Sequence, residues 1–346
     1  MKEIGSEYWI CNKNSFDSNI YLLSGRTAID VALQDILNYK DVGNVYLPAW
    51  CCDSMLQPFL DRSIDVCFYD MSYGDGHLFY EIDNDYHTDI LYFTNYFGYH
   101  NTLSSEIIRS FKEQGSVIIY DQTHSLFQED DQYVDLADYT FASIRKWVGV
   151  PCGAYLSKNN GPMTRPLLHD YPYISEKIDA MRLKADYIEG RKSIPKQSFL
   201  DKYNSFNHHL AECYRDYRID DLSLFLWDNT DKNTIKSRRQ LNSVYLQTYL
   251  QDISQIQLMF QAMSDDCCLF VPILFNSEKE RNRVRHYLTS HSIYCPVHWP
   301  KPSLIKDFMH VNNLYSCELS LICDQRYDVK DMSRILETLI DAIENK

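Results

Sequence analysis

An alternation of short apolar runs with segments of helical spacing extends from Tyr21 to about Ser157 and limits the folds open to this chain. Helical patterns such as Ala28–Leu37 and Ser104–Gln114 separate the apolar runs. Strands that alternate with helices form a mostly parallel sheet with helices on both faces. We therefore predict an α/β fold with strands at Val45–Leu47, Val66–Tyr69, Ile90–Phe93, Val117–Tyr120, Tyr139–Ala142 and Ala154–Leu156.

The C-terminal part follows a different pattern. A long helical pattern runs from about Asn233 to Met263 and leads into alternating strands and helices. The expected elements are a strand at Leu269–Phe275, a helix at Ser277–Ser290, a strand entering Pro296–Pro300, a strand at Glu318–Ile322 and a closing helix at Lys330–Ile343. This arrangement predicts a compact α+β unit. We divide the chain into a large α/β domain, residues 1–232, and a connector helix with a small domain, residues 233–346.

Charge and composition argue against several classes of protein. The formal net charge of -14 at pH 7 disfavours nucleic-acid binding through a basic surface. No apolar run reaches the roughly 18 residues of a membrane span, and the first residues lack the apolar region of a signal peptide. The 11 cysteines lack the spacing of a zinc site, so we expect reduced thiols, no metal and no membrane association. We expect a cytoplasmic protein.

The first candidate site is Lys146, which follows Ser143 by three residues inside an apolar and aromatic run, Thr140 to Gly153. A lysine in a dry site loses its proton near neutral pH, because burial disfavours the ammonium form, and it then forms an imine with an aldehyde. The alternative is an ordinary surface lysine.

Two further segments add to this candidate. Asp121 begins where the predicted strand Val117–Tyr120 ends, at the sheet edge where α/β folds bind ligands. A carboxylate there can keep the ring nitrogen of pyridoxal phosphate (PLP) protonated, or it can cap the next helix. Ser24-Gly25-Arg26-Thr27 leads into a helical pattern, whose free N–H groups can hold a phosphate, although Ser-Gly is also an ordinary helix cap.

These motifs and others occur in an order that resembles the DegT-type (DegT/DnrJ/StrS) aminotransferases, PLP enzymes of fold type I that mostly act on nucleotide-linked keto-sugars. The resemblance covers nearly the whole chain. It rests on Ser24-Gly25-Arg26-Thr27-Ala28, Leu47-Pro48-Ala49-Trp50, Asn95-Tyr96-Phe97-Gly98, Asp121-x-x-His124, Ser143-x-x-Lys146, Ile293-Tyr294-Cys295-Pro296-Val297-His298-Trp299-Pro300 and Cys323-Asp324-Gln325-Arg326-Tyr327.

The resemblance implies a role for each matching residue. Lys146 looks like the Schiff-base lysine that also moves the substrate proton, and Asp121 looks like the partner of the ring nitrogen. By the same resemblance, His124 would lie near the ring or its phenolic oxygen, and Asn95 would also contact that oxygen. Trp50 would stack on the ring, unless Cys51 or Cys52 takes that place. Gly25, Arg26, Thr27 and Ser143 would hold the phosphate.

The same resemblance extends to substrate and assembly. His298 and Arg326 are candidate substrate contacts, with Arg326 pairing with the carboxylate of the amino donor, and a structural role is the alternative for each. The implied enzyme is a homodimer with shared active sites that moves an amino group from an amino acid, glutamate, to a nucleotide-linked keto-sugar. Another PLP-dependent reaction (lyase, dehydratase or condensation) and a non-catalytic binding protein are the competing functions.

A local basic cluster lies in the polar, tyrosine-rich segment between residues 159 and 231. Its members either form a solvated helix face or meet the phosphates of a nucleotide-linked substrate or of the other subunit's coenzyme. They are Arg182, Lys184, Arg191, Lys192 and Lys196.

Overall fold

The structure is a computed structural model that describes residues 19–344, apart from residues 101, 130, 192, 264, 265 and 307. Its large sheet has eight strands in the order β1-β8-β7-β6-β5-β2-β3-β4. The strands are β1 (Ile20–Leu22), β2 (Asn44–Pro48), β3 (Asp65–Gly74), β4 (His77–Glu81), β5 (Ile90–Thr94), β6 (Val117–Asp121), β7 (Tyr139–Ala142) and β8 (Ala154–Lys158). The six predicted strands all form, and the predicted α/β fold with a mostly parallel sheet is confirmed.

The parallel part of the sheet brings the candidate residues to one edge. Strands β3, β2, β5, β6 and β7 are parallel neighbours, while β4, β8 and β1 pair antiparallel at the two sides. Every residue of β5 and β6 is buried, as expected for strands covered on both faces. Thr94 pairs in register with Asp121, and Asp121 with Phe141. The carboxyl ends of these three strands therefore meet at one place.

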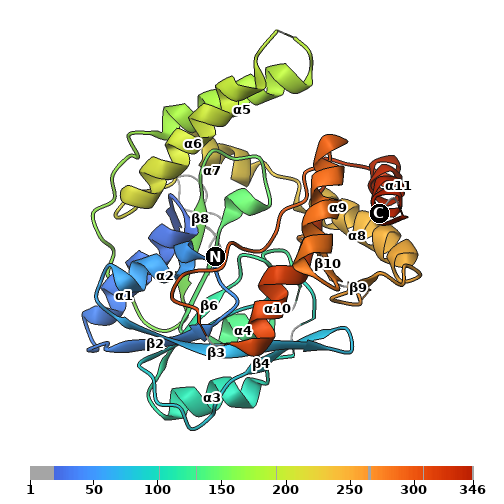
Figure 1. Ribbon diagram of the computed structural model, residues 1–346. Helices are drawn as coiled ribbons and strands as arrows, with labels where there is room; N and C mark the ends of the chain where they lie inside the picture. Colours follow the sequence, from blue (N-terminus) through green and yellow to red (C-terminus); the bar gives the residue numbers. More distant parts are fainter. Residues whose placement is uncertain are drawn as a thin grey trace, which may run out of the picture.

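Helices cover both faces of this sheet. In the view of Figure 1, α1 (Gly25–Leu37) and α2 (Asp53–Leu60) lie above the strands and α3 (Ser105–Glu113) lies below them; the short α4 (Gln132–Leu136) packs against α3 and β6. Helix α1 begins at a Ser24 cap, whose side chain accepts a hydrogen bond from Thr27 N at 3.2 Å. Its buried face carries Ala28, Val31 and Ala32, small enough to let the helix lie close to the sheet.

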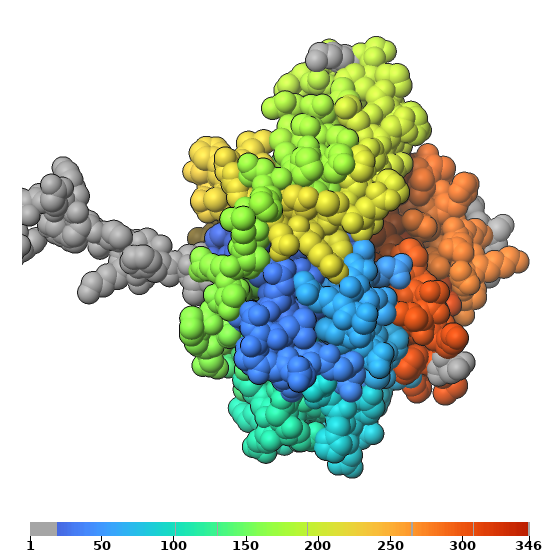
Figure 2. Space-filling model, turned by 90° about the vertical axis from the view of Figure 1, so that its left-hand side faces the viewer, coloured from blue at the N-terminus to red at the C-terminus, as the bar shows by residue number. Residues whose placement is uncertain are grey.

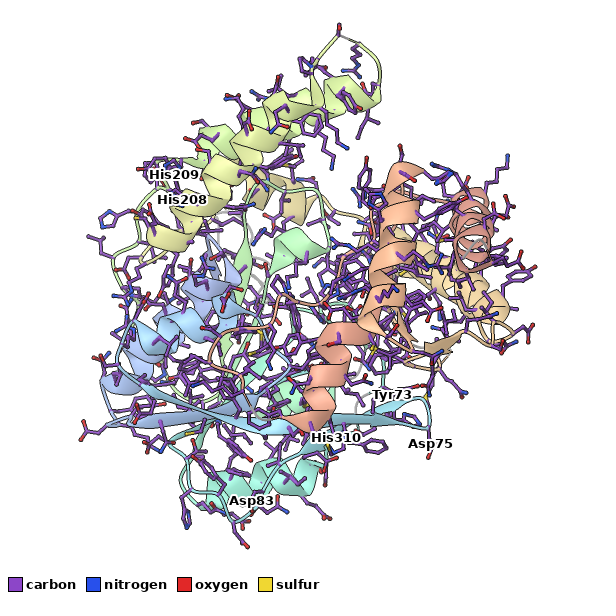
Figure 3. The ribbon with its side chains drawn as sticks, viewed as in Figure 1. Tyr73, Asp75, Asp83, His208, His209 and His310 are labelled. Atoms are coloured by element: carbon purple, nitrogen blue, oxygen red, sulfur yellow. The ribbon has the colours of Figure 1, made fainter. Side chains whose placement is uncertain are left out.

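Strands β3 and β4 form a hairpin that the sequence analysis did not predict. Residues 74–77 join the two strands in a tight turn, in which Asp75 and Gly76 have φ of 52° and 77°. Such φ values suit a two-residue hairpin turn. Figure 3 shows Asp75 at the tip of this hairpin, with Tyr73 just before it. The Tyr73 hydroxyl donates to Leu258 O at 2.6 Å, which ties the hairpin to the C-terminal part.

The polar segment after β8 folds into three helices, α5 (Ile174–Ile188), α6 (Lys196–Glu212) and α7 (Asp221–Asp228). Helices α5 and α6 pack against each other as a hairpin that projects beyond the body of the protein (Figures 1 and 2). Figure 3 shows His208 and His209 on α6. The His209 ring stacks on Tyr173 at 3.8 Å. Of the basic cluster, Lys192 lies outside the described residues.

The C-terminal part contains a second sheet, with β9 (Ile256–Leu258), β10 (Val271–Phe275) and β11 (Glu318–Leu321) antiparallel in the order β11-β10-β9. Its helices are α8 (Lys232–Leu250), α9 (Glu278–Ser290), α10 (Met309–Cys317) and α11 (Val329–Glu344). Helix α10 reaches across to the large sheet, where Val311 N donates to Asp70 Oδ1 at 3.2 Å. The division of the chain at residue 232 stays a prediction.

Two expectations for this part were wrong. The helical pattern from Asn233 to Met263 ends at Leu250, because the chain turns there and residues 256–258 pair with β10. The segment Pro296–Pro300 is not a strand. Pro296 O accepts from Ser320 N of β11 at 3.0 Å, but His298 N donates to the side chain of Glu318, at Oε2, at 2.6 Å, so regular strand pairing does not continue along the segment. Within the described ranges, no helix has the length and apolar character to cross a bilayer.

Candidate functional site

A cavity opens at the carboxyl ends of β5, β6 and β7, beside the N-terminus of α1. The volume of this cavity is about 80 Å³. Six of the predicted site residues line it, namely Gly25, Arg26, Asp121, His124, Ser143 and Lys146. These residues come from three separate segments of the sequence, and the parallel sheet brings them together.

Lys146 ends a short 3₁₀ turn, η2 (Ile144–Lys146), that follows β7 directly. Its Nζ lies 3.4 Å from His124 Nε2. The residue is exposed, because its side chain opens onto the cavity, yet the protein around it excludes enough water that desolvation lowers the pKa of the ammonium group. Arg145 lowers this pKa further, while Cys52 and Asp121 oppose the shift. An amine with a lowered pKa is the nucleophile that the sequence led us to expect.

Asp121 ends β6 and is buried at the base of the cavity. Its Oδ2 accepts from the Tyr92 hydroxyl at 2.7 Å, and its Oδ1 accepts from Thr123 N at 2.8 Å. Burial nevertheless raises the pKa of the carboxyl. Among the described residues, no cation forms an ion pair with it. A positive charge brought into the cavity against this carboxylate would therefore be stabilised.

His124 lies in an aromatic stack. Its ring is 5.0 Å from the Phe97 ring and 5.6 Å from the Trp299 ring, with interplanar angles of 29° and 28°. Burial, with the nearby cation of Lys146, holds the pKa of His124 well below its usual value of 6.5. The imidazole is neutral at neutral pH, and its buried Nδ1 has no hydrogen-bond partner among the described residues. Trp299 also lines the cavity, so the C-terminal part contributes a ring to the site.

Two arginine side chains give part of the cavity wall a positive charge. Arg26, in the first turn of α1, donates from Nη1 to Leu210 O at 2.9 Å, while its Nε is buried without a partner. Arg145 also lines the cavity and has a buried Nε without a partner. The sequence analysis missed Arg145. The available signal was a second cation directly before Lys146 inside an otherwise apolar run.

Three predicted residues are directed elsewhere. Thr27 is fully buried, and its hydroxyl donates to Tyr214 O at 2.8 Å. Trp50 is fully buried as well; its Nε1 donates to His298 O at 2.6 Å and its ring stacks on Tyr96. Asn95 donates from Nδ2 to Gln128 Oε1 at 2.7 Å. None of the three lines the cavity, whereas Cys52 does, as the alternative to Trp50 allowed.

The two candidate substrate residues are also engaged with the protein. His298 is buried, and its Nδ1 lies 2.9 Å from Ser320 Oγ. Arg326 forms a two-point ion pair with Asp324, with N–O distances of 2.9 and 2.6 Å. This pairing is the alternative, structural role that the sequence left open for Arg326.

A second cavity adjoins Lys146 on the side of the α5–α6 hairpin. It is lined by Lys146 and Arg145 together with Lys177, Arg326 and Tyr203. Burial lowers the pKa of Lys177 to about 8, and the cations of Arg145 and Lys184 add to the shift. Lys177, Arg145 and Lys184 repel one another, and such a group of positive charges attracts an anionic ligand. No group of three or more potential metal ligands occurs in the part of the chain that the structure describes.

The sequence and the structure were compared with those of known proteins. No family model matches the sequence, and no curated protein matches it. Among solved structures, Spr1654 of Streptococcus pneumoniae, described as a sugar aminotransferase in its PLP form, superposes with a TM-score of 0.67 and 13% identity, over 94% of this chain and 87% of that one. The chain has the fold of these enzymes.

Two further structures agree. Helicobacter pylori PseC, an aminotransferase involved in the biosynthesis of pseudoaminic acid, gives a TM-score of 0.66 and 13% identity, over 95% of this chain and 87% of PseC. A DegT DnrJ EryC1 StrS aminotransferase from Brucella abortus gives 0.60 and 12%, over 93% and 85% of the two chains. The predicted fold type I is therefore confirmed.

Proposed function

We propose that the chain is a PLP-dependent aminotransferase of the DegT type. The observation that carries this proposal is Lys146, an amine of lowered pKa at the carboxyl edge of a fold type I sheet, in one cavity with the carboxylate of Asp121. The PLP and pyridoxamine phosphate forms of the structural neighbour Spr1654 support the choice of cofactor.

The residues present fit PLP. Among the residues that the structure describes, no cation forms an ion pair with the buried carboxylate of Asp121, and this carboxylate would stabilise a protonated ring nitrogen. The orphaned Nε of Arg26 and the start of α1 face the same cavity and suit the phosphate. His124 and Trp299 supply rings beside it. PLP, when bound, supplies an electron sink for the substrate Cα.

The chain's own residues would do the rest. Lys146 Nζ would hold the cofactor and would take up and return the proton at the substrate Cα. Asp121 would keep the ring nitrogen protonated, and the stacked rings of His124 and Trp299 would border the cofactor in the cavity. Neutral His124 adds no positive charge that would oppose proton uptake by the lysine.

The substrates are the finer part of the proposal. We propose glutamate as the amino donor and a nucleotide-linked keto-sugar as the acceptor. The descriptions of Spr1654 as a sugar aminotransferase and of PseC as an enzyme of pseudoaminic acid biosynthesis support a sugar acceptor. Lys177, in the second cavity beside Lys146, is a cation suited to a phosphorylated ligand.

We propose a cytoplasmic homodimer that binds neither nucleic acid nor membranes. All ten described cysteines are free, which suits a reducing compartment. Helix α7 exposes Leu222, Phe225 and Leu226, an apolar surface of the kind that dimers bury. Light scattering with size-exclusion chromatography tests the dimer, and a monomeric mass at working concentration would contradict it.

A two-step experiment tests the reaction. Purified protein is incubated with PLP and reduced with borohydride, and peptides are mapped by mass spectrometry; we expect PLP fixed on Lys146 and none fixed in Lys146→Arg. Unreduced protein is then given L-glutamate, and one equivalent of 2-oxoglutarate per site is expected. Ammonia or pyruvate released from other amino acids would favour a lyase or dehydratase. Failure to take up PLP would favour a non-catalytic binding protein and would refute the proposal.

A further inference from the structure

The C-terminal part contains a cavity that the proposed reaction does not use. Its volume is about 530 Å³, compared with about 80 Å³ for the cavity beside Lys146, and lies within the range of small-molecule sites. The described residues that line it lie between positions 278 and 316, on α9, on α10 and on the chain that joins these two neighbouring helices (Figure 1). Only Trp299 among them also lines the cavity beside Lys146. The cavity is therefore a separate place in the fold that shares one residue with the proposed cofactor site.

Positive charge prevails in this cavity. Arg281, Arg285 and Lys301 line it, and Glu278 is the one acidic residue among the described lining residues. This excess of cations is local, since the chain as a whole has a formal net charge of -14. Within the described ranges, neither Arg285 nor Lys301 forms an ion pair with a carboxylate. Such a group of positive charges attracts an anionic ligand.

Arg281 is the most buried of the three cations, with 5% of its surface exposed. Its Nη1 donates to Glu318 O at 3.0 Å, and its Nε donates to Asn282 Oδ1 at 2.8 Å. Its Nη2 lies 3.7 Å from Glu278 Oε1, which is too far for a hydrogen bond. Burial lowers the pKa of this guanidinium group; the carboxylates of Glu278 and Glu318 oppose the shift, and the cation of Arg285 adds to it. The fold thus holds a guanidinium fork in place at the cavity, and such a fork suits a phosphate.

Apolar groups complete the lining of the cavity. They are the ring of Trp299 and the side chains of Pro296, Val297 and Pro300. An inorganic anion would leave this apolar surface in contact with water, whereas a ligand that carries both phosphates and a flat ring matches both kinds of wall. A nucleoside diphosphate has this chemistry, and its base can pack against an aromatic side chain.

Two residues of this cavity also contact the surroundings of Lys146. The Lys146 Nζ lies 6.0 Å from the centre of the Trp299 ring. The Tyr315 hydroxyl donates to Cys51 O at 2.7 Å and accepts from Cys51 N at 2.9 Å. The next residue, Cys52, lines the cavity beside Lys146. A ligand that fixes Trp299 and Tyr315 therefore also fixes parts of the wall around Lys146.

We propose that this cavity is a regulatory site for a nucleoside diphosphate, whose phosphates bind Arg281, Arg285 and Lys301. The bound nucleotide orders Trp299 and Tyr315 and thereby tightens the binding of PLP. The nucleotide site itself does not depend on the reaction, while the effect on PLP rests on the proposed function. By linkage, PLP tightens the binding of the nucleotide by the same factor.

Calorimetric titration of the cofactor-free full chain tests the nucleotide site, with UDP, ADP and inorganic pyrophosphate as probes. We expect at least one of the two nucleotides to bind with one molecule per chain, and pyrophosphate to bind at least about 10-fold more weakly because it lacks the ring. Arg285→Met and Lys301→Met should each weaken nucleotide binding about 10-fold or more. Both residues are exposed, so these substitutions spare the core. Lys279→Met is the matched control, since Lys279 is exposed on the same helix as Arg285 and does not line the cavity.

Two results would overturn the site. One is the absence of binding by both nucleotides, and the other is binding that Arg285→Met and Lys301→Met leave unchanged. Circular dichroism checks that the variants fold, and if one of them does not, the other decides. The proposed acceptor also carries a nucleotide, and Lys177→Met distinguishes that source. If nucleotide binding depends on Lys177, in the second cavity, and not on Arg285, the nucleotide belongs to the acceptor and the regulatory site is overturned.

The effect of the nucleotide on the cofactor is measured as the affinity for PLP with and without saturating nucleotide. We expect PLP to bind at least about fivefold more tightly with nucleotide in the wild type, and no such change in Arg285→Met. An unchanged affinity in the wild type would overturn the regulatory role. If nucleotide binds through Arg285 but PLP does not become fixed to Lys146, the proposed function fails and the nucleotide site stands. If PLP becomes fixed to Lys146 and neither nucleotide binds, the proposed function stands and the nucleotide site fails.

Discussion

Lys146 Nζ lies 3.4 Å from His124 Nε2, and desolvation lowers the pKa of both groups. An imidazole held neutral can sit beside an amine without opposing its protonation and deprotonation. A histidine of ordinary pKa would carry a proton in mildly acidic solution and would repel the ammonium form. The pair thus gives the lysine a neutral polar neighbour at the cavity.

The first prediction concerns the pKa of Lys146 in the cofactor-free protein. Competitive acetylation across pH, with mass spectrometry of the peptide that contains Lys146, should give an apparent pKa below the ordinary value of 10.5. Asp121→Asn should lower it further, because the Asp121 carboxylate stabilises the ammonium form. Exposed Lys279 is the internal reference. A higher pKa in Asp121→Asn would contradict this electrostatic account.

Asp121→Asn should also separate binding from turnover. The amide keeps the size of the side chain but removes the negative charge against the ring nitrogen, so we expect the rate of the glutamate reaction to fall about 100-fold or more. PLP should still be fixed to Lys146 by borohydride. Single-turnover measurements of 2-oxoglutarate give the rate. Activity within about twofold of wild type would remove Asp121 from its proposed role.

A substitution at Thr27 tests whether its hydroxyl stabilises the fold or binds the cofactor. Its hydroxyl donates to Tyr214 O, so Thr27→Val should leave that buried carbonyl without this partner and destabilise the protein by about 1 to 3 kcal/mol. Thr27→Ser keeps the hydroxyl and should lose less. Urea unfolding gives the stabilities and titration gives the affinity for PLP, which we expect to be unchanged. If Thr27→Val were as stable as wild type but bound PLP more weakly, Thr27 would instead be a residue that binds the phosphate.

The sequence allowed prediction of features that depend on neighbouring residues. The strand Tyr139–Ala142 and the position of Asp121 at the end of a buried strand follow from local apolar runs and from the rule that ligands bind at carboxyl strand ends. Lys146 could be singled out because it follows Ser143 by three residues inside an apolar run and because Asp121 and the Ser24–Thr27 turn precede it in the order of the DegT-type motifs, although an ordinary surface lysine was the alternative. Such signals need no knowledge of distant contacts.

Long-range contacts account for what the sequence did not predict. Trp50 is hydrogen-bonded to His298 O, 248 positions away, and this contact holds it inside the protein instead of at the cavity. Trp299 reaches the cavity only because the C-terminal part folds back over the sheet. Arg145 acquires its significance from Arg26, which is remote in sequence, so neither residue alone indicated a pair of converging cations.

The last prediction follows from the pKa of Lys177, which burial lowers to about 8 from an ordinary 10.5. Below about pH 8 the folded protein holds this cation in a desolvated place near Arg145. Between about pH 8 and 10.5 the unfolded chain binds more protons than the folded one at this residue, so the free energy of unfolding gains a contribution that rises with pH.

Lys177→Met should therefore be more stable than wild type at pH 7, by about 1 kcal/mol, since one pKa unit corresponds to about 1.4 kcal/mol and solvent screens part of the shift. The difference between the two proteins should shrink as the pH rises toward 10. Urea unfolding at pH 7, 8, 9 and 10 measures it, with Lys279→Met as the exposed control. A constant difference across this range would show that packing, and not desolvation of the ammonium group, separates the two proteins.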